Sequence, residues 1–153
     1  TLMKTFIIGT LSLLLAFTLI GCSEDEDKSQ LPVFSEIAAD RDVLRPGDVV
    51  TFTAVQTTPG NLINRTSYTW KLDNETILDN NVIYDNDKSN PTCQITIPEK
   101  NSITVTFKGS YNPSASQWKP VPSTQPISGG SINYTLATLK GEVTINKTFR
   151  ILR

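Results

Sequence analysis

The strongest constraint on the fold is a repeated alternation of apolar and polar residues in short segments. Residues 50–54 read Val-Thr-Phe-Thr-Ala, and residues 68–72 read Tyr-Thr-Trp-Lys-Leu. A period of two places successive side chains on opposite faces of a strand, so one face can be buried while the other meets water. No stretch after residue 22 shows a sustained helical period. The pattern therefore predicts an all-β fold.

The alternating segments are separated by turn-forming residues, such as Arg45-Pro46-Gly47-Asp48. About seven strands are expected, at 34–38, 50–54, 68–72, 93–97, 103–107, 132–139 and 143–152, with a long Pro- and Ser-rich loop over 112–130. A tryptophan on the third strand is typical of the core of an immunoglobulin-like sandwich, and Trp70 has that position. We therefore predict an immunoglobulin-like β-sandwich.

Three motifs resemble the PKD-like members of that superfamily: Pro46-Gly47-Asp48 before a strand, Tyr68-Thr69-Trp70, and the strand over 102–107. The resemblance spans about residues 34–107. It implies an extracellular spacer or adhesion module, often found beside carbohydrate-active enzymes, with no catalytic residues. The chain departs from the family pattern after the tryptophan, where Leu72-Asp73-Asn74-Glu75 stands in place of an aromatic residue and Gly-Asp-Gly.

The N-terminal segment has the layout of a bacterial signal peptide. Lys4 precedes an apolar stretch over 6–20, which is short for a membrane span of about 20 residues. The run Leu19-Ile20-Gly21-Cys22 closes this stretch and resembles the lipobox of bacterial lipoproteins. The resemblance implies a signal peptide over 1–21 and cleavage before Cys22. It also implies that lipid attached to Cys22 anchors the protein to the membrane. A buried helix or a retained anchor helix is the alternative.

An acidic run follows directly, because residues 23–27 read Ser-Glu-Asp-Glu-Asp. It is similar to the signal that exports lipoproteins to the cell surface in Bacteroidetes, which implies an outer-membrane protein exposed on the cell surface. An ordinary solvated tether is the alternative, since like charges repel and extend a chain. We expect an acidic flexible tether over 22–32 and a single sandwich domain over 33–153.

The composition of the chain argues against several classes of function. The formal net charge is −1 with no basic cluster, which argues against a nucleic-acid partner. The chain has no histidine, and so lacks the usual general base and the commonest metal ligand. No catalytic motif or cofactor motif is found, so we predict neither an enzyme nor a cofactor, although a carboxylate pair such as Asp73 with Asp85 leaves a glycosidase open. Cys93 alternates with Ile95 and Ile97, which predicts a buried thiol.

The loop from Tyr111 to Gln125 provides the first candidate binding site, made by Tyr111, Trp118 and Lys119. Long loops are often functional, and an exposed indole can stack on a sugar ring or anchor a protein partner. The alternative is that Trp118 folds back and covers one end of the sandwich.

A weaker candidate is a calcium loop with Asp85, Asp87 and Ser89, whose oxygen atoms stand at alternate positions. It lacks the glycine and the later glutamate of an EF-hand, so a solvated turn is the alternative and no metal site is predicted.

Two functions follow from these features. The first is a lipid-anchored, non-catalytic binding module for a polysaccharide, acting as an accessory in glycan uptake. The second is a structural or protein-interaction lipoprotein without a small ligand, which could be a spacer, an adhesin component or an assembly subunit. In the second case, the last strand over 143–152 could bind its partner by strand addition.

Overall fold

The computed structural model describes residues 28–79, 83–84 and 89–153. Its strands are β1 (Lys28–Ser29), β2 (Val33–Ala39), β3 (Val49–Thr58), β4 (Ile63–Leu72), β5 (Glu75–Asp79), β6 (Ile83–Tyr84), β7 (Thr92–Thr96), β8 (Ser102–Pro113), β9 (Gln117–Trp118), β10 (Gln125–Ile127), β11 (Gly130–Ala137) and β12 (Lys140–Arg150).

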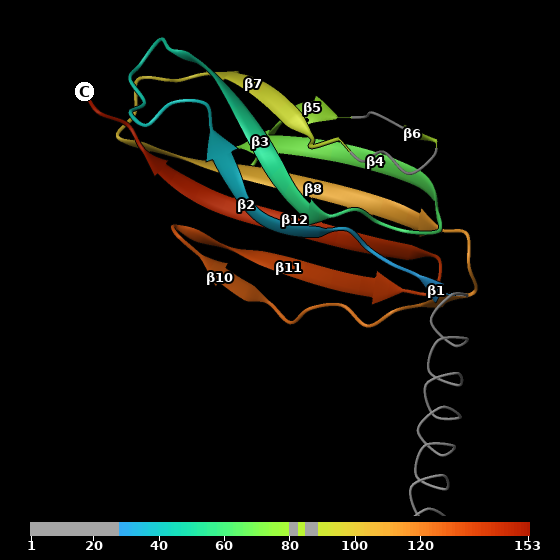
Figure 1. Cartoon of the computed structure of the whole chain (residues 1–153). Helices are drawn as coiled ribbons and strands as arrows, with labels where there is room; N and C mark the ends of the chain where they lie inside the picture. The colour runs from blue at the N-terminus through green and yellow to red at the C-terminus, as the bar shows by residue number, and fades with distance from the viewer. Residues whose placement is uncertain (1–27, 80–82, 85–88) are drawn as a thin grey trace, which may run out of the picture.

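Two β-sheets pack face to face around one core (Figure 1). The larger sheet has the strand order β10-β11-β12-β8-β4-β5, with β6 also paired to β4, and the smaller sheet has the order β2-β3-β7. β1 and β9 form a separate short parallel pair. The predicted all-β, immunoglobulin-like sandwich is confirmed.

The core follows directly from the alternation in the sequence. On β8, every second residue from Ile103 to Tyr111 is buried. One of these buried positions is Gly109, which contributes no side chain to the core. The ring of Phe107 lies 5.0 Å from Trp70 and 5.3 Å from Phe34 between ring centroids, so aromatic side chains of both sheets meet there. Trp70 is only 1% exposed and is a core residue, as predicted.

The sandwich has more strands than the seven expected, because residues 114–139 are not a simple loop followed by one strand. These residues add β9 and β10 before β11, which matches the strand expected over 132–139, and β1, β5 and β6 are three more strands outside the expected set. β11 pairs with β12 from Gly130↔Lys147 to Ala137↔Lys140, and β8 pairs with the other side of β12. The last strand is therefore flanked on both sides, and the prediction that it offers a free edge for strand addition is wrong.

The end of the expected tether belongs to the domain. Ser29 is fully buried, and its hydroxyl donates to the Leu62 carbonyl at 2.7 Å and accepts from the Ala115 N–H at 3.1 Å. Leu31 is also buried in the core. The prediction of a flexible tether is thus wrong for residues 28–32. The expected signal peptide, Cys22 and the acidic run lie outside the described residues.

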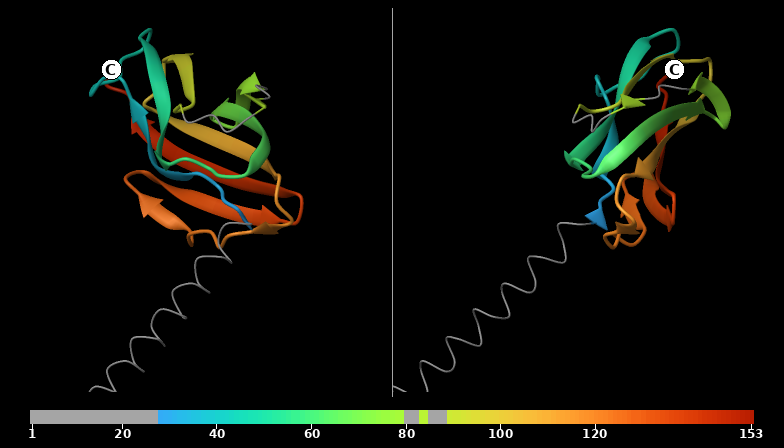
Figure 2. Two further views of the ribbon diagram at one scale, coloured as in Figure 1. Left: turned by 45° about the vertical axis from the view of Figure 1, so that its right-hand side comes forward. Right: turned by 90° about the vertical axis from the view of Figure 1, so that its right-hand side faces the viewer.

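The sandwich is elongated, and its two ends carry different segments (Figure 2). We call the end where the described chain begins the entry pole; it contains residues 28–31, 61–62, 113–119 and 136–141. We call the opposite end, next to the C-terminus, the distal pole; it contains residues 40–48, 98–101 and 150–153. The strands of both sheets run between these poles (Figure 1).

Candidate functional site

A tight turn between β2 and β3 shapes the distal pole. The Asp48 N–H donates to the Arg45 carbonyl at 3.1 Å, and the Asp48 carboxylate accepts from the Arg45 N–H at 3.0 Å. Gly47 has φ +87°, a left-handed conformation that glycine adopts without strain. Pro46 and Gly47 therefore stand where a β-turn needs them, and the turn predicted from the sequence is confirmed.

The segment before this turn runs beside the end of β12. The Leu152 N–H donates to the Leu44 carbonyl at 2.8 Å, and Leu44 and Ile151 form a parallel β-bridge. Leu44 and Ile151 are both buried in the core. Their neighbours are not, because Val43 is 48% exposed and Leu152 is 42% exposed. The backbone bridge thus holds two exposed apolar side chains at the distal pole.

A cleft of about 230 Å³ lies between these segments and is lined by Asp42, Val43, Leu44, Arg150 and Leu152. Its volume is below the roughly 300–1,000 Å³ of pockets that enclose a small-molecule ligand. The cleft is therefore large enough for one or two side chains of a partner.

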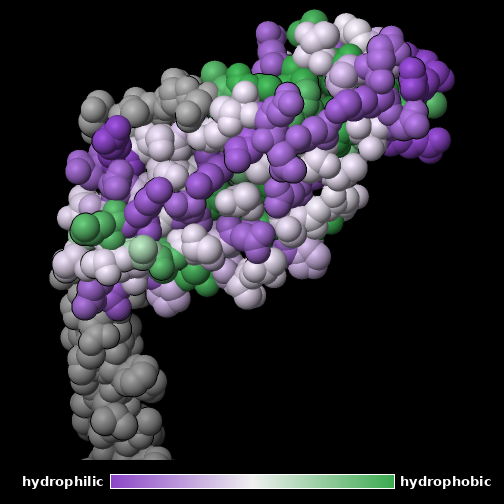
Figure 3. Space-filling view, turned by 180° about the vertical axis from the view of Figure 1, so that it is seen from behind, coloured by the Kyte–Doolittle hydropathy of each residue, from purple (hydrophilic) through white to green (hydrophobic). Residues whose placement is uncertain are grey.

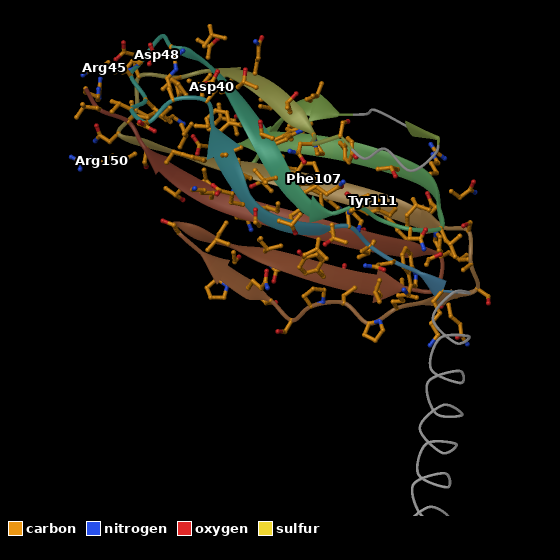
Figure 4. The ribbon with its side chains drawn as sticks, in the orientation of Figure 1. Asp40, Arg45, Asp48, Phe107, Tyr111 and Arg150 are labelled. Atoms are coloured by element: carbon orange, nitrogen blue, oxygen red, sulfur yellow. The ribbon has the colours of Figure 1, made fainter. Side chains whose placement is uncertain are left out.

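Most charges around the cleft are neutralised within the domain. The Arg41 guanidinium lies 3.3 Å from the Asp48 carboxylate and 3.8 Å from that of Asp40. The two charged residues that line the cleft differ, because neither Asp42 nor Arg150 has an ion-pair partner among the residues that the structure describes. Figure 4 shows Asp40, Asp48 and Arg150 together at this end of the molecule.

This arrangement suits recognition of another chain. Val43 and Leu152 offer apolar surface, Arg150 offers a guanidinium fork that matches a carboxylate, and Asp42 offers an acceptor. Arginine is one of the residues enriched among those that contribute most to protein–protein binding. Among the described residues, no group of three Asp, Glu, Cys or His side chains could hold a metal ion.

Sequence reasoning did not find this cleft. One signal was available, since Val43 and Leu44 form an apolar pair inside a charged loop and break the polar character of their neighbours. The partner wall comes from Arg150 and Leu152, more than a hundred positions later. Only the pairing of the two segments brings them together.

The structure does not bring the three predicted ligand residues into one exposed site. Tyr111 is 3% exposed and belongs to the core. Burial raises the pKa of its hydroxyl well above the ordinary value, and the neighbouring Tyr68 and Tyr134 raise it further. The prediction that Tyr111 contacts a ligand is therefore wrong, because its alternation with Phe107 and Val105 on β8 turns it inward.

Trp118 and Lys119 lie at the entry pole. Trp118 pairs with Ser29, its indole N–H donates to the Ala137 carbonyl at 2.9 Å, and its ring packs partly against the core. Lys119 is held by its backbone N–H, which donates to the Ser29 carbonyl at 2.8 Å. The indole thus covers one end of the sandwich, which was the alternative considered for it.

The other residues singled out from the sequence are those of the weak calcium candidate and Cys93. Asp85 and Asp87 of the weak calcium candidate lie outside the described residues, while Ser89 lies in an exposed bend. Cys93 is buried and unpaired, as expected, and burial raises the pKa of its thiol.

The fold and the cleft define a small β-sandwich domain with a side-chain-sized cleft at one pole. Comparison with protein-family models, with curated proteins and with solved structures finds no match in any of the three. Within the part of the chain that the structure describes, no helix is long and apolar enough to cross a membrane.

Proposed function

We propose that this protein is a lipid-anchored, non-catalytic protein-interaction module of the bacterial cell envelope, exposed on the surface of the outer membrane. Its partner is a protein segment that carries a carboxylate beside an apolar side chain. The observation that supports this most is the distal cleft, where Arg150, which has no ion-pair partner among the described residues, stands beside exposed apolar side chains.

The position of the cleft supports the same function. It lies at the pole opposite the first described residue, Lys28, and Cys22 precedes that residue by six positions. Lipid attached to Cys22 would hold the entry pole close to the membrane, so the distal cleft would be presented away from it. The acidic run over 23–27 supports export to the cell surface, and a distal contact site suits a spacer or an assembly subunit.

The test is site-specific crosslinking in cells that produce the full chain. A photo-reactive amino acid replaces Val43 in the cleft, and a matched control replaces Ile77, which is 42% exposed on β5. We expect one discrete protein adduct from position 43 and none from position 77. The charge reversal Arg150→Glu should abolish the adduct at position 43. An adduct that persists in Arg150→Glu, or that forms equally from both positions, would refute the proposal.

Polysaccharide binding in a glycan-uptake system remains the second prediction. The structure gives it less support than the sequence did, because the indole N–H of Trp118 is already bonded to Ala137 and the ring is partly covered. Affinity electrophoresis of the parent and of Trp118→Ala against a panel of polysaccharides tests it. Retardation that disappears in the variant, together with no adduct from position 43, would favour the glycan function.

A further inference from the structure

The entry pole joins four chain segments that are far apart in the sequence. Gln30 and Asn61 exchange two backbone hydrogen bonds, of 2.9 and 3.0 Å. The Leu62 carbonyl also accepts from the Ser114 N–H at 2.9 Å, and the Asn112 side chain donates to the Leu139 carbonyl at 3.0 Å. These bonds, with those of Ser29, fix the relative positions of all four segments. The entry pole is therefore a built surface.

This surface carries leucine side chains that the core does not bury. Leu139 is 76% exposed at the tip of the β11–β12 turn, Leu62 is 38% exposed, and Leu136 is 37% exposed. Seen from behind, apolar side chains reach the surface close to the point where the described chain begins (Figure 3). Turn tips favour Gly, Asn, Asp, Ser and Pro, so the exposed leucine at this tip adds apolar surface where a polar residue is usual.

The segments of the entry pole also carry basic side chains. Lys28 and Lys119 have no ionic partner within the described residues, whereas Lys140 pairs with Glu142 at 3.1 Å. Trp118 lies among them with an apolar ring and a bonded N–H. Leucine, tryptophan and lysine together are the side chains that occupy the boundary between lipid headgroups and acyl chains.

We infer that the entry pole is a contact face for the surface of a phospholipid bilayer, with Leu139 at its centre. The six residue steps from Cys22 to Lys28 span at most about 22 Å, so a lipid on Cys22 keeps this pole within reach of the headgroups. This inference rests on the lipid anchoring proposed above. The four acids over 24–27 offset the lysines, so the apolar side chains are the source of the contact and the lysines meet headgroup phosphates.

A few leucines would bind a bilayer only weakly from free solution. The anchor changes this, because the second contact becomes intramolecular and needs only a small favourable free energy. The entry pole would then rest on the membrane surface, and the distal cleft would face away from the membrane.

The test uses the full chain in its lipid-anchored form, reconstituted in phosphatidylcholine vesicles and spin-labelled at single positions. The variants are Leu139→Cys and, as matched control at the distal pole, Val43→Cys. Cys93 is buried with a raised thiol pKa, which protects it from labelling, and Cys22 carries the lipid. The unsubstituted chain, carried through the same labelling, must remain unlabelled.

We expect the label at position 139 to collide several-fold less with a water-soluble nickel chelate than the label at position 43, and more with oxygen. Equal collision of both labels with the chelate, in chains that float with the vesicles, would overturn the contact face and leave the anchor intact. Failure to float with the vesicles would remove the anchor and the contact face together.

A second measurement needs no substitution. Lipids brominated on their acyl chains should quench the fluorescence of Trp118 at the entry pole and leave the core residue Trp70 unquenched. No quenching by brominated lipid in floating chains would also overturn the inference.

Discussion

Two tyrosines of the core differ in whether their hydroxyls form hydrogen bonds, so comparing their substitutions tests the packing. The Tyr134 hydroxyl accepts from the Phe34 N–H at 3.0 Å and donates to the Phe34 carbonyl at 3.4 Å, so it satisfies both backbone groups on the outer edge of β2. The Tyr111 hydroxyl is buried with no hydrogen-bond partner in the described part of the chain. It lies over Gly109, where a Cβ would collide with it.

Removing the two hydroxyls should therefore change the free energy of unfolding with opposite signs. Tyr134→Phe leaves two buried backbone groups of Phe34 unpaired, which costs about 1–3 kcal/mol. Tyr111→Phe removes a buried hydroxyl that has no bond to lose, and should stabilise the fold by up to about 1 kcal/mol. The fluorescence of the buried Trp70 reports unfolding in urea, where 1 kcal/mol moves the midpoint by roughly 0.5 M.

The pH dependence adds a second readout. Burial raises the pKa of both Tyr111 and Tyr134 in the folded protein. A raised pKa means that the unfolded chain ionises first, so the stability that these groups contribute is fully present below about pH 10 and is lost as the pH rises further. Tyr111→Phe should flatten this alkaline loss. If Tyr111→Phe instead destabilises the protein as much as Tyr134→Phe, the hydroxyl is bonded and the reasoning fails.

Three further substitutions test other parts of the structure by the same urea titration. Asp73→Ala should lower the free energy of unfolding by about 1 kcal/mol, because it removes the hydrogen bond to the Thr104 N–H, whereas Asp73→Asn keeps an acceptor. That bond and Lys100 lower the pKa of Asp73, so the loss of stability in Asp73→Ala should shrink as the pH falls below about 4. A loss that stays constant with pH would contradict this prediction. Leu31→Ala should lower the free energy of unfolding by about 2–5 kcal/mol, because Leu31 is buried. An unchanged free energy of unfolding would instead support a flexible tether at this position. Trp118→Phe should cost about 0.5–1.5 kcal/mol for its lost hydrogen bond, and an unchanged midpoint would contradict the bonded indole.

The sequence predicted the core well and the ends of the sandwich poorly. Alternation placed Trp70, Phe107 and Cys93 inside, because a period of two fixes which face each side chain takes once one face is buried. The same rule applied one step further would have placed Tyr111 inside, since it continues the alternation of β8. The predicted strand ends at Phe107, four residues before Tyr111, and the candidate loop begins at Tyr111.

The poles depend on pairings that no local pattern specifies. Ser29 is polar and follows an acidic run, so composition indicated a tether, yet its hydroxyl links segments 33 and 86 positions away. The cleft likewise needs the bridge between Leu44 and Ile151. In both cases the deciding contacts are single hydrogen bonds between remote segments, which periodicity and turn chemistry do not encode.

The segment inserted between β8 and β12 connects the fold to the proposed functions. β11 covers the side of β12 that β8 leaves open, and β10, which carries Pro126 in a strand of three residues, makes a blunt sheet edge. Short edge strands with proline resist the addition of another chain. The same insertion carries Trp118 to β1 and fixes where the chain enters the domain. One segment thus closes the edge of the last strand and builds the entry pole, the surface of the proposed membrane contact.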